Sequence, residues 1–267
     1  MGACKDPRLT YLNDQGYNVV RLPRKGIVPL GVIGRDGNAR NWLGTIDQIW
    51  TSPVPVPKPG DPQPAAGIKG TKTSDLKISF GLEILANALS GMFGSTVPSL
   101  DAAYKDAKSV QFSFKEVQSV GIDPFVIGNF LAKGDLSGGP VVKRFFTGQQ
   151  HVEALIVTEV LQSKSIGVIG KKDSGTEVGV NVPQIQATLG AKINVSLATG
   201  SQSEVVYEGQ DFLVFGYKAF GIAMVNGEWT IHGIDVDAEN AFAIGSAPDP
   251  LVDSNQLVDI DFNPPKH

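Results

Sequence analysis

The sequence predicts a sheet-rich protein with a single main domain, and three observations support this. Its 267 residues are 42% hydrophobic and 19% charged, which is enough apolar material for a substantial core. The 31 glycines and 17 prolines favour many short strands joined by turns over a helical bundle. Apolar and polar residues also alternate in several segments, and Asn226-Gly227 is typical of a tight hairpin turn between Phe220–Val225 and Glu228–Ile234.

In the first half of the chain, helices are indicated by capping residues and helical spacing, and strands by a period of two. In chain order the predicted elements are a helix from Asp6 to Gly16, a strand over Tyr17–Leu22, a helix over Asn41–Trp50, a proline-rich loop over Ser52–Gly67, a strand over Leu76–Ile84, a helix over Leu85–Phe93 and a strand over Val110–Lys115.

The second half repeats this plan. Asp123-Pro124 predicts the start of a short helix that runs to Leu131, and Ser137–Pro140 predicts a turn. A strand is expected over Val152–Leu161 and a polar break over Lys171–Gly175.

The segment from Pro183 to Leu197 fits two structures. An early proline and a stop at Gly190 favour a short helix over Pro183–Leu189. Apolar residues nevertheless occupy every odd position from Ile185 to Leu197, which is the period of a strand. Both interpretations stay open from the sequence.

No catalytic or metal-binding chemistry is recognisable. The single cysteine excludes an internal disulfide framework and a zinc site built on cysteines, and a net charge of −4 gives no reason to expect nucleic acid. Ser137-Gly138-Gly139-Pro140 lacks the Lys-Ser/Thr of a phosphate loop. Other candidates are explained more simply as structural or solvated residues, and they are His151, His232, His267, Asp235 and Asp237. We therefore expect no enzyme, no metal and no soluble cofactor.

The start of the chain has no apolar stretch that resembles a signal-peptide core, and no run approaches 18 apolar residues. Asp6 stands where myristoylation of Gly2 would need Ser or Thr. The expected location is therefore the cytoplasm. Cys4 has two interpretations, namely a free thiol without a role or the acceptor of a thioester-linked fatty acid.

The C-terminal end is unlike a disordered tail. Gly245–Pro250 cannot be helical and is expected to form an exposed, cleavable loop. Beyond it, Val258, Ile260 and Phe262 alternate with Asp259 and Asp261, as in an edge strand that docks on the body.

Several stretches together resemble a bacterial gasdermin. They are the short segment around Cys4, Tyr11–Arg24, Ile27–Gly34, Tyr207–Gly209 and Leu213–Ala219. The resemblance spans nearly the whole chain, including its length and the short tail in place of a regulatory domain.

The resemblance implies an α+β fold in which a twisted, mainly antiparallel central sheet carries peripheral helices. It implies a pore-forming domain over residues 1–246 and an autoinhibitory peptide over residues 247–267. A protease encoded nearby would remove the peptide, and the monomer would then assemble into large β-barrel pores in the inner membrane that kill the cell in defence against phage. Cys4 matches the acylated cysteine of the family, which implies a palmitoyl group.

Three sets of residues follow from this reading. The cleavage region is Gly245, Ser246, Ala247, Asp249 and Leu251, and the autoinhibitory contacts are Leu257, Val258, Ile260 and Phe262. The residues expected in membrane strands are Ile78, Phe80, Leu82, Phe112, Phe114, Ile185, Leu189, Ile193, Val195 and Leu197. A soluble lipid- or ligand-binding β-rich module uses the same strands without refolding, and a hydrolase without a known motif is a third possibility.

Overall fold

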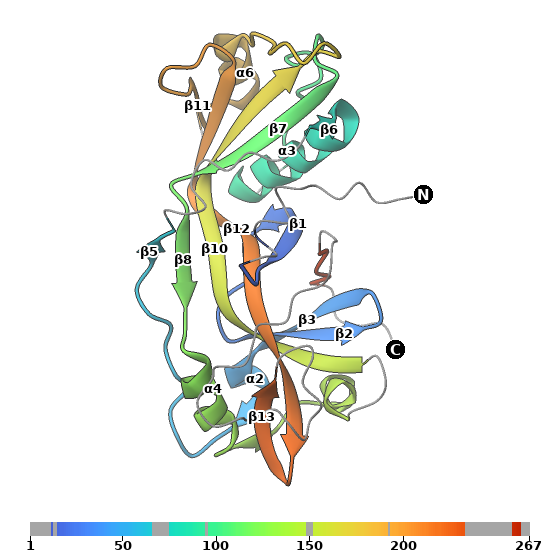
Figure 1. Cartoon of the computed structure of the whole chain (residues 1–267), viewed down its shortest axis with the longest axis vertical. Coiled ribbons are helices and arrows are strands. Elements are labelled where there is room, and N and C mark those ends of the chain that lie inside the picture. Colours follow the sequence, from blue (N-terminus) through green and yellow to red (C-terminus); the bar gives the residue numbers. More distant parts are fainter. Residues whose placement is uncertain are drawn as a thin grey trace.

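The protein has an α+β fold built on two long antiparallel strands, β10 (Val152–Lys171) and β12 (Glu204–Val225). A computed structural model describes Leu12 and residues 15–65, 75–93, 96–147, 152–191, 193–232 and 258–262. In Figure 1 the two long strands run along most of the length of the molecule, and the other strands flank them above and below. This confirms the predicted sheet with peripheral helices.

The lower part of the sheet has the strand order β1 (Asn18–Arg24), β12, β10, β2 (Gly31–Asp36) and β3 (Ala39–Thr45), so β1 and β3 are its two end strands. We call this the lower sheet. Three further strands extend it, namely β5 (Gln63–Pro64), β8 (Gln118–Gly121) and β13 (Glu228–His232).

The upper sheet consists of β6 (Leu76–Lys77), β7 (Ser109–Lys115) and β11 (Asn194–Leu197), with the ends of β10 and β12 between them. Helix α3 (Ile78–Phe93) and helix α6 (Val182–Leu189) lie beside these strands in Figure 1. The order in this part is β6, β7, β10, β12 and β11.

Short elements complete the lower end of the molecule. They are α2 (Ile46–Ile49), β4 (Trp50–Thr51), α4 (Pro124–Leu131), β9 (Asp135–Leu136), α5 (Pro140–Lys143) and a 3-10 turn (Arg144–Phe146). The predicted start of α4 is confirmed, because the Asp123 carboxylate accepts a hydrogen bond from the Phe125 N–H and Pro124 is the first helical residue.

A break in pairing separates the two parts of the long strands. Ser163 pairs with Leu213, but Ser165 already pairs with Glu208, so residues 209–212 of β12 bulge opposite a single residue of β10. The buried Ser163 hydroxyl accepts from the Ser165 N–H at 3.0 Å, and its single proton is within reach of two acceptors, the Lys115 carbonyl of β7 and the Ser165 carbonyl of β10. These hydrogen bonds supply partners for the polar groups of Ser163 and Ser165 where the pairing between β10 and β12 is interrupted.

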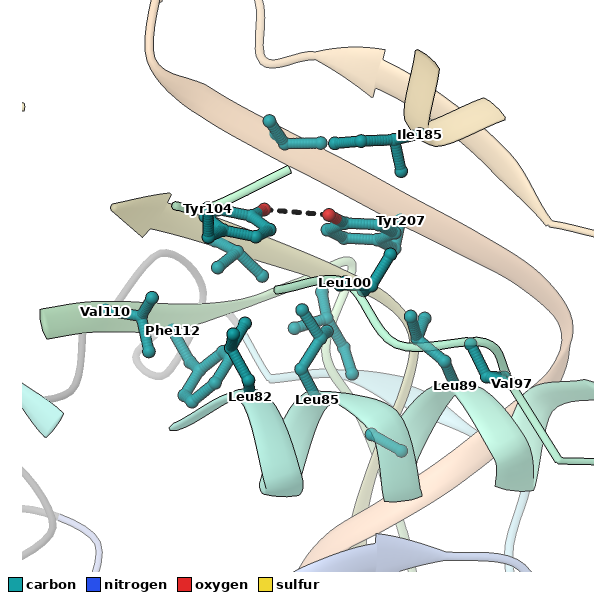
Figure 2. Packing of buried hydrophobic residues seen from close by; sticks show 14 of the residues in the cluster. Leu82, Leu85, Leu89, Val97, Leu100, Tyr104, Val110, Phe112, Ile185 and Tyr207 are labelled. Carbon is teal, nitrogen blue, oxygen red and sulfur yellow. Dashed lines mark hydrogen bonds between the residues drawn. The ribbon is translucent and has the colours of Figure 1, made fainter. Parts of the chain in front are cut away.

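The largest core lies beneath the upper sheet. Figure 2 shows Leu82, Leu85 and Leu89 of α3 pointing toward the strands, and all three belong to one buried cluster with Val110 and Phe112 of β7. The Tyr104 and Tyr207 hydroxyls meet inside this core at 2.7 Å. Burial raises the pKa of both phenols, so each stays protonated and the pair is held by a neutral hydrogen bond.

Two predicted elements are wrong. The strand over Leu76–Ile84 ends after Lys77, and Ile78, Phe80 and Leu82 belong to α3. Their spacing satisfies a period of two, but the chain continues into a helical stripe. Gly81 permits the helix to lie against β7, since a Cβ there would come within 2.0 Å of Val110.

The helix predicted over Asn41–Trp50 is also mostly strand. Residues up to Thr45 form β3, which pairs with β2, and only Ile46–Ile49 are helical. The backbone hydrogen bonds with β2 stabilise a strand here more than the spacing of Leu43, Ile46 and Ile49 favours a helix.

Both interpretations of Pro183–Leu197 are correct for different residues. Helix α6 ends at Leu189 before Gly190, whose φ is +76°, and β11 begins at Asn194. The Asn226-Gly227 hairpin is confirmed as well, with φ values of +52° and +87°.

Candidate functional site

Residues 258–262, which we call the tail segment, lie between the two end strands of the lower sheet. The Val258 N–H donates to the Val19 carbonyl of β1 at 2.7 Å. Three residues further on, the Asp261 N–H donates to the Arg40 carbonyl at 2.8 Å and the Trp42 N–H donates to the Asp261 carbonyl at 2.7 Å. The tail segment thus forms one parallel bridge with β1 and another with β3.

Two apolar side chains of the tail segment complete the core of the lower sheet. Val258 is 5% exposed and Ile260 is 6% exposed, whereas Asp259 and Asp261 face solvent. Both buried residues pack in one cluster with residues of β1, β2, β10 and β12. The alternation predicted for this stretch is confirmed over the described residues, but the segment joins two edges instead of extending one.

Phe262 anchors the end of the tail segment. Its ring stacks on Trp42 with centroids 5.1 Å apart, and the Arg24 guanidinium lies 3.8 Å from its centroid on a cation–π contact. Arg24 Nη1 also donates to the Ile260 carbonyl at 3.3 Å. Burial lowers the pKa of Arg24, while the nearby Asp261 carboxylate opposes this shift. The contact therefore joins an aromatic, a cationic and a backbone interaction at one point.

The predicted membrane-strand residues come together in the soluble fold, but from different kinds of element. Phe112 and Phe114 lie on β7, Ile185 and Leu189 on α6, and Val195 on β11. All of these except Phe114 are buried, and Phe114 is half-buried with its ring stacked on Phe215 at 3.9 Å. The apolar side chains of the upper sheet are thus covered by its own helices.

Leu197 is the exception. It lies on β11 and is 44% exposed. It is therefore the member of the predicted membrane set that can be changed with the least effect on the soluble core.

The opposite face of the upper sheet carries a polar cluster that sequence reasoning missed. Glu204, only 7% exposed, accepts from the Ser113 hydroxyl at 2.7 Å and pairs with the Lys115 ammonium at 2.7 Å. Gly167 makes room for it, since a Cβ there would lie 2.4 Å from both Glu204 and Ser113. The alternation of Ser113 and Lys115 with Phe112 and Phe114 indicates a polar face on this strand. It does not identify Glu204 as the partner of these residues, because Glu204 lies 91 residues after Ser113.

Several predicted residues lie outside the described residues. These are Cys4, Gly245, Ser246, Ala247, Asp249, Leu251 and Leu257, together with His151, His267, Asp235 and Asp237. His232 is half-buried on β13 beside Gly221, consistent with a structural role. In the part of the chain that the structure describes, no cluster of three metal-ligating side chains occurs and no helix is long and apolar enough to cross a membrane.

The fold and this site define a class of protein in which the end strands of a twisted sheet are bridged by a segment from the same chain. A family model described as the Bacterial Gasdermin Family matches residues 20–230. A gasdermin bGSDM of Vitiosangium sp. is 35% identical over 98% of this chain and 99% of that protein, and one of a Desulfuromonadales bacterium is 34% identical over 92% of each. The chain belongs to the bacterial gasdermin family.

The fold agrees with this assignment. The structure of a bacterial gasdermin from Bradyrhizobium tropiciagri matches with a TM-score of 0.62 over 97% of both chains, at 15% identity. Gasdermins are pore-forming cell-death effectors, and membership supports this general function for the chain over an enzymatic one.

Proposed function

We propose that this chain is held inactive by its C-terminal residues and forms membrane pores after a protease removes them. The observation that carries the proposal is the tail segment, which bridges β1 and β3 through backbone hydrogen bonds and buries Val258 and Ile260. Removing it would break the hydrogen bonds that the Val19 and Arg40 carbonyls and the Trp42 N–H make with the tail segment at two sheet edges. The body would then be less stable as a monomer and more inclined to pair with other strands.

Tethering explains how a short segment can control the body. A covalently attached tail acts at an effective concentration of about 1 mM. With an intrinsic dissociation constant of about 10 μM it would be docked about 99% of the time. Once cut at sub-micromolar protein, the same peptide would be mostly dissociated at equilibrium. Cleavage within Gly245–Leu251 would therefore activate the body without any change to its side chains.

The pore itself would be a β-barrel built from the upper sheet. A membrane strand needs about 9–11 residues with one apolar and one polar face. The apolar face would come from Phe112, Phe114, Val195 and their neighbours, and the polar face from Ser113, Lys115 and Glu204. Helices α3 and α6 would have to unfold, which would convert Ile78, Phe80, Leu82, Ile185 and Leu189 from helix to strand.

The remaining elements of the proposal concern the cell. Palmitoylation of Cys4 would add membrane affinity, although a single acyl chain gives only marginal binding. The uncut protein would be a cytoplasmic monomer, a protease encoded nearby would cut it, and the assembled body would permeabilise the inner membrane as a defence against phage. Family membership and the docked tail segment support this sequence of events.

One observation favours a different function, that of a lipid- or ligand-binding module. A pocket of about 330 Å³ lies between α4 and the β12–β13 hairpin and is lined by Phe125, Trp229 and Ile231, among others. Its volume suits a small apolar ligand. Such a module would bind lipid without releasing the contents of a vesicle.

The test uses full-length protein with a recognition site for a specific protease placed within Gly245–Leu251. We expect rapid release of dye from vesicles of bacterial lipids after cutting, and none from uncut protein or from protein without the site treated with the same protease. Size exclusion should show large assemblies in detergent extracts of the leaking vesicles. A cut body that stays folded and binds vesicles without releasing dye would contradict pore formation and support the binding module.

A further inference from the structure

The pocket of about 330 Å³ between α4 and the β12–β13 hairpin lies at the lower end of the molecule (Figure 1). One wall is the face of α4 that carries Phe125 and Gly128, and the opposite wall is β13 with Glu228, Trp229 and Ile231. Its volume is at the lower end of the range for small-molecule sites, so the pocket suits a short ligand and not a whole acyl chain.

Gly128 keeps the wall on α4 low. A glycine within a helix is less favourable than an alanine, so a close contact usually explains its presence. No close contact explains Gly128, because the nearest atom to an added Cβ would be Cγ1 of Ile231 at 4.0 Å, an ordinary contact distance. Since Ile231 belongs to the opposite wall, a side chain at position 128 would extend into the pocket.

Trp229 is held in a fixed orientation. Its indole N–H donates to the Asp135 carboxylate at 3.0 Å, and its ring meets Trp50 and Phe146 edge to face, with centroids 5.3 Å and 5.8 Å apart. A side chain that is already ordered loses little freedom when a ligand binds. The exposed ring of Phe125 supplies a second aromatic surface from the other wall.

The elements that form the pocket also expose apolar side chains to solvent. Among the described residues six large hydrophobic side chains are exposed, and Phe125, Val126 and Met224 are three of them. All three belong to α4 or to the β12–β13 hairpin. Single exposed hydrophobic residues are common, but a group of them beside a pocket indicates an interaction site.

Glu228 sets the charge of the ligand. It is the one charged side chain among the described residues that line the pocket, and it makes no ion pair or side-chain hydrogen bond with another described residue. A carboxylate beside aromatic rings favours an organic ammonium ion, because the carboxylate attracts the positive charge and the rings attract the charged methyl or methylene groups.

We propose that this pocket binds an organic ammonium ion with a short apolar group, with Glu228 as its counter-ion and Phe125 and Trp229 as its aromatic walls. A free ammonium compound and the ammonium headgroup of a phospholipid both have this chemistry. The site goes beyond the proposed function, because binding takes place in uncut protein and requires neither cleavage nor pores.

The charge requirement is tested by titrating uncut protein with choline and with 3,3-dimethyl-1-butanol, which has the same shape without the charge. Amide NMR signals of residues 125–132 and 225–231 should shift, with an affinity for choline about fivefold higher than for the neutral alcohol. Glu228→Gln should remove this preference. Glu83→Gln, on an exposed residue of α3, is the matched control and should retain it.

The pocket itself is tested with Gly128→Leu. The new side chain should fill the pocket and abolish binding of both compounds, while the melting temperature stays the same or rises because leucine favours a helix more than glycine does. Equal affinities of wild type for the two compounds, or full binding of choline by folded Gly128→Leu, would overturn the site.

Flotation of uncut protein with vesicles of phosphatidylcholine distinguishes the two sources of the ligand. Flotation that falls several-fold in both Glu228→Gln and Gly128→Leu would assign the site to a lipid headgroup. Binding of free choline by wild type that does not float would assign it to a free ammonium compound. No shift with choline together with equal flotation of wild type and both variants would overturn the proposal. Dye release after cleavage is measured separately, so a failure of pore formation would leave the result for this pocket unchanged.

Discussion

Phe262 and Trp42 stack with their ring planes only 12° apart, although 219 residues lie between them in the sequence. The pair joins the last described residue of the chain to β3, and Arg24 of β1 completes the contact from the other side. The environment of the Phe262 ring therefore indicates whether the tail segment is docked on both β1 and β3.

Phe262→Ala should weaken docking of the tail. The ring is half-buried, so its loss should cost about 1.5 kcal/mol, or roughly tenfold in affinity. The undocked fraction of uncut protein should then rise about tenfold, so that uncut Phe262→Ala releases vesicle dye while uncut wild type does not, and the Trp42 amide should exchange faster. Phe125→Ala removes an equivalent ring from α4 and should leave exchange at Trp42 unchanged. Full protection of Trp42 in Phe262→Ala would show that the stacking does not hold the tail.

Gly31→Ala should disturb the same contact through Trp42. A Cβ at Gly31 would lie 2.0 Å from the outer carbon Cη2 of Trp42, so the indole has to shift and its stacking on the ring of Phe262 changes. We expect a loss of about 1–3 kcal/mol in unfolding free energy and faster hydrogen exchange along the tail segment. Gly179→Ala, where nothing lies within 4 Å, is the matched control in urea denaturation. Equal stability of the two variants would contradict the packing described here.

The Tyr104–Tyr207 hydroxyl pair should behave as a unit. Tyr207→Phe leaves the buried Tyr104 hydroxyl without this partner and should cost about 1–3 kcal/mol. The double variant with Tyr104→Phe removes both hydroxyls and should recover much of that loss. Urea denaturation of the two single variants and the double variant measures the coupling, and additive losses would mean that the hydrogen bond contributes little.

Leu197 is a better probe of the membrane than Ile193. Ile193 is fully buried, so a charge there would disrupt the soluble core, whereas Leu197 is 44% exposed. Leu197→Lys should fold normally, but a lysine on the lipid face costs about 2–4 kcal/mol near mid-membrane, so the cut protein should release dye far more slowly. Ser196→Lys, one residue away and on the other face of β11, should have a small effect. Rapid release by Leu197→Lys would rule out a lipid-facing position for this residue.

Asp135 should make folding sensitive to acid. The Trp229 indole N–H donates to its carboxylate at 3.0 Å and holds the pKa of Asp135 below its ordinary value, and the Leu136 N–H adds to this. A carboxylate whose pKa is lower in the folded state stabilises the protein above its unfolded pKa, and this contribution is lost as pH falls through the folded value. The melting temperature of wild type should therefore fall more between pH 6 and pH 3 than that of Asp135→Asn. Parallel curves for the two proteins would show that the interaction contributes nothing to stability.

Local signals in the sequence were sufficient for some elements. The Asn226-Gly227 hairpin and the Asp123-Pro124 helix start were predictable because each depends on the conformations open to two neighbouring residues. The strand predicted at Ile78 was wrong because its residues fit both periods, and the close approach of Gly81 to β7 is a tertiary contact.

Long-range pairs account for the parts of the candidate site that could not be predicted. The alternation of Val258 and Ile260 predicted a docked segment, but not that it would reach two edges at once. Likewise the sequence around Ser113 indicates a polar face, whereas its hydrogen bond to Glu204 depends on a register set by β10 between them.

If the tail is cut as we propose, its two attachment points also determine how fast it leaves the body. After a cut, the contact with β1 at Val258 and the contact with β3 at Asp261 have to open together before the peptide can diffuse away. While one contact remains closed, the other reforms readily, because only two residues, Asp259 and Ile260, separate the two contacts and keep the open end nearby. Escape of the peptide would therefore be slower than the opening of either contact, and a severed molecule would pass through an interval in which its tail is cut but still docked. During that interval several neighbours can be cut as well, so that molecules processed one at a time become competent in closer succession.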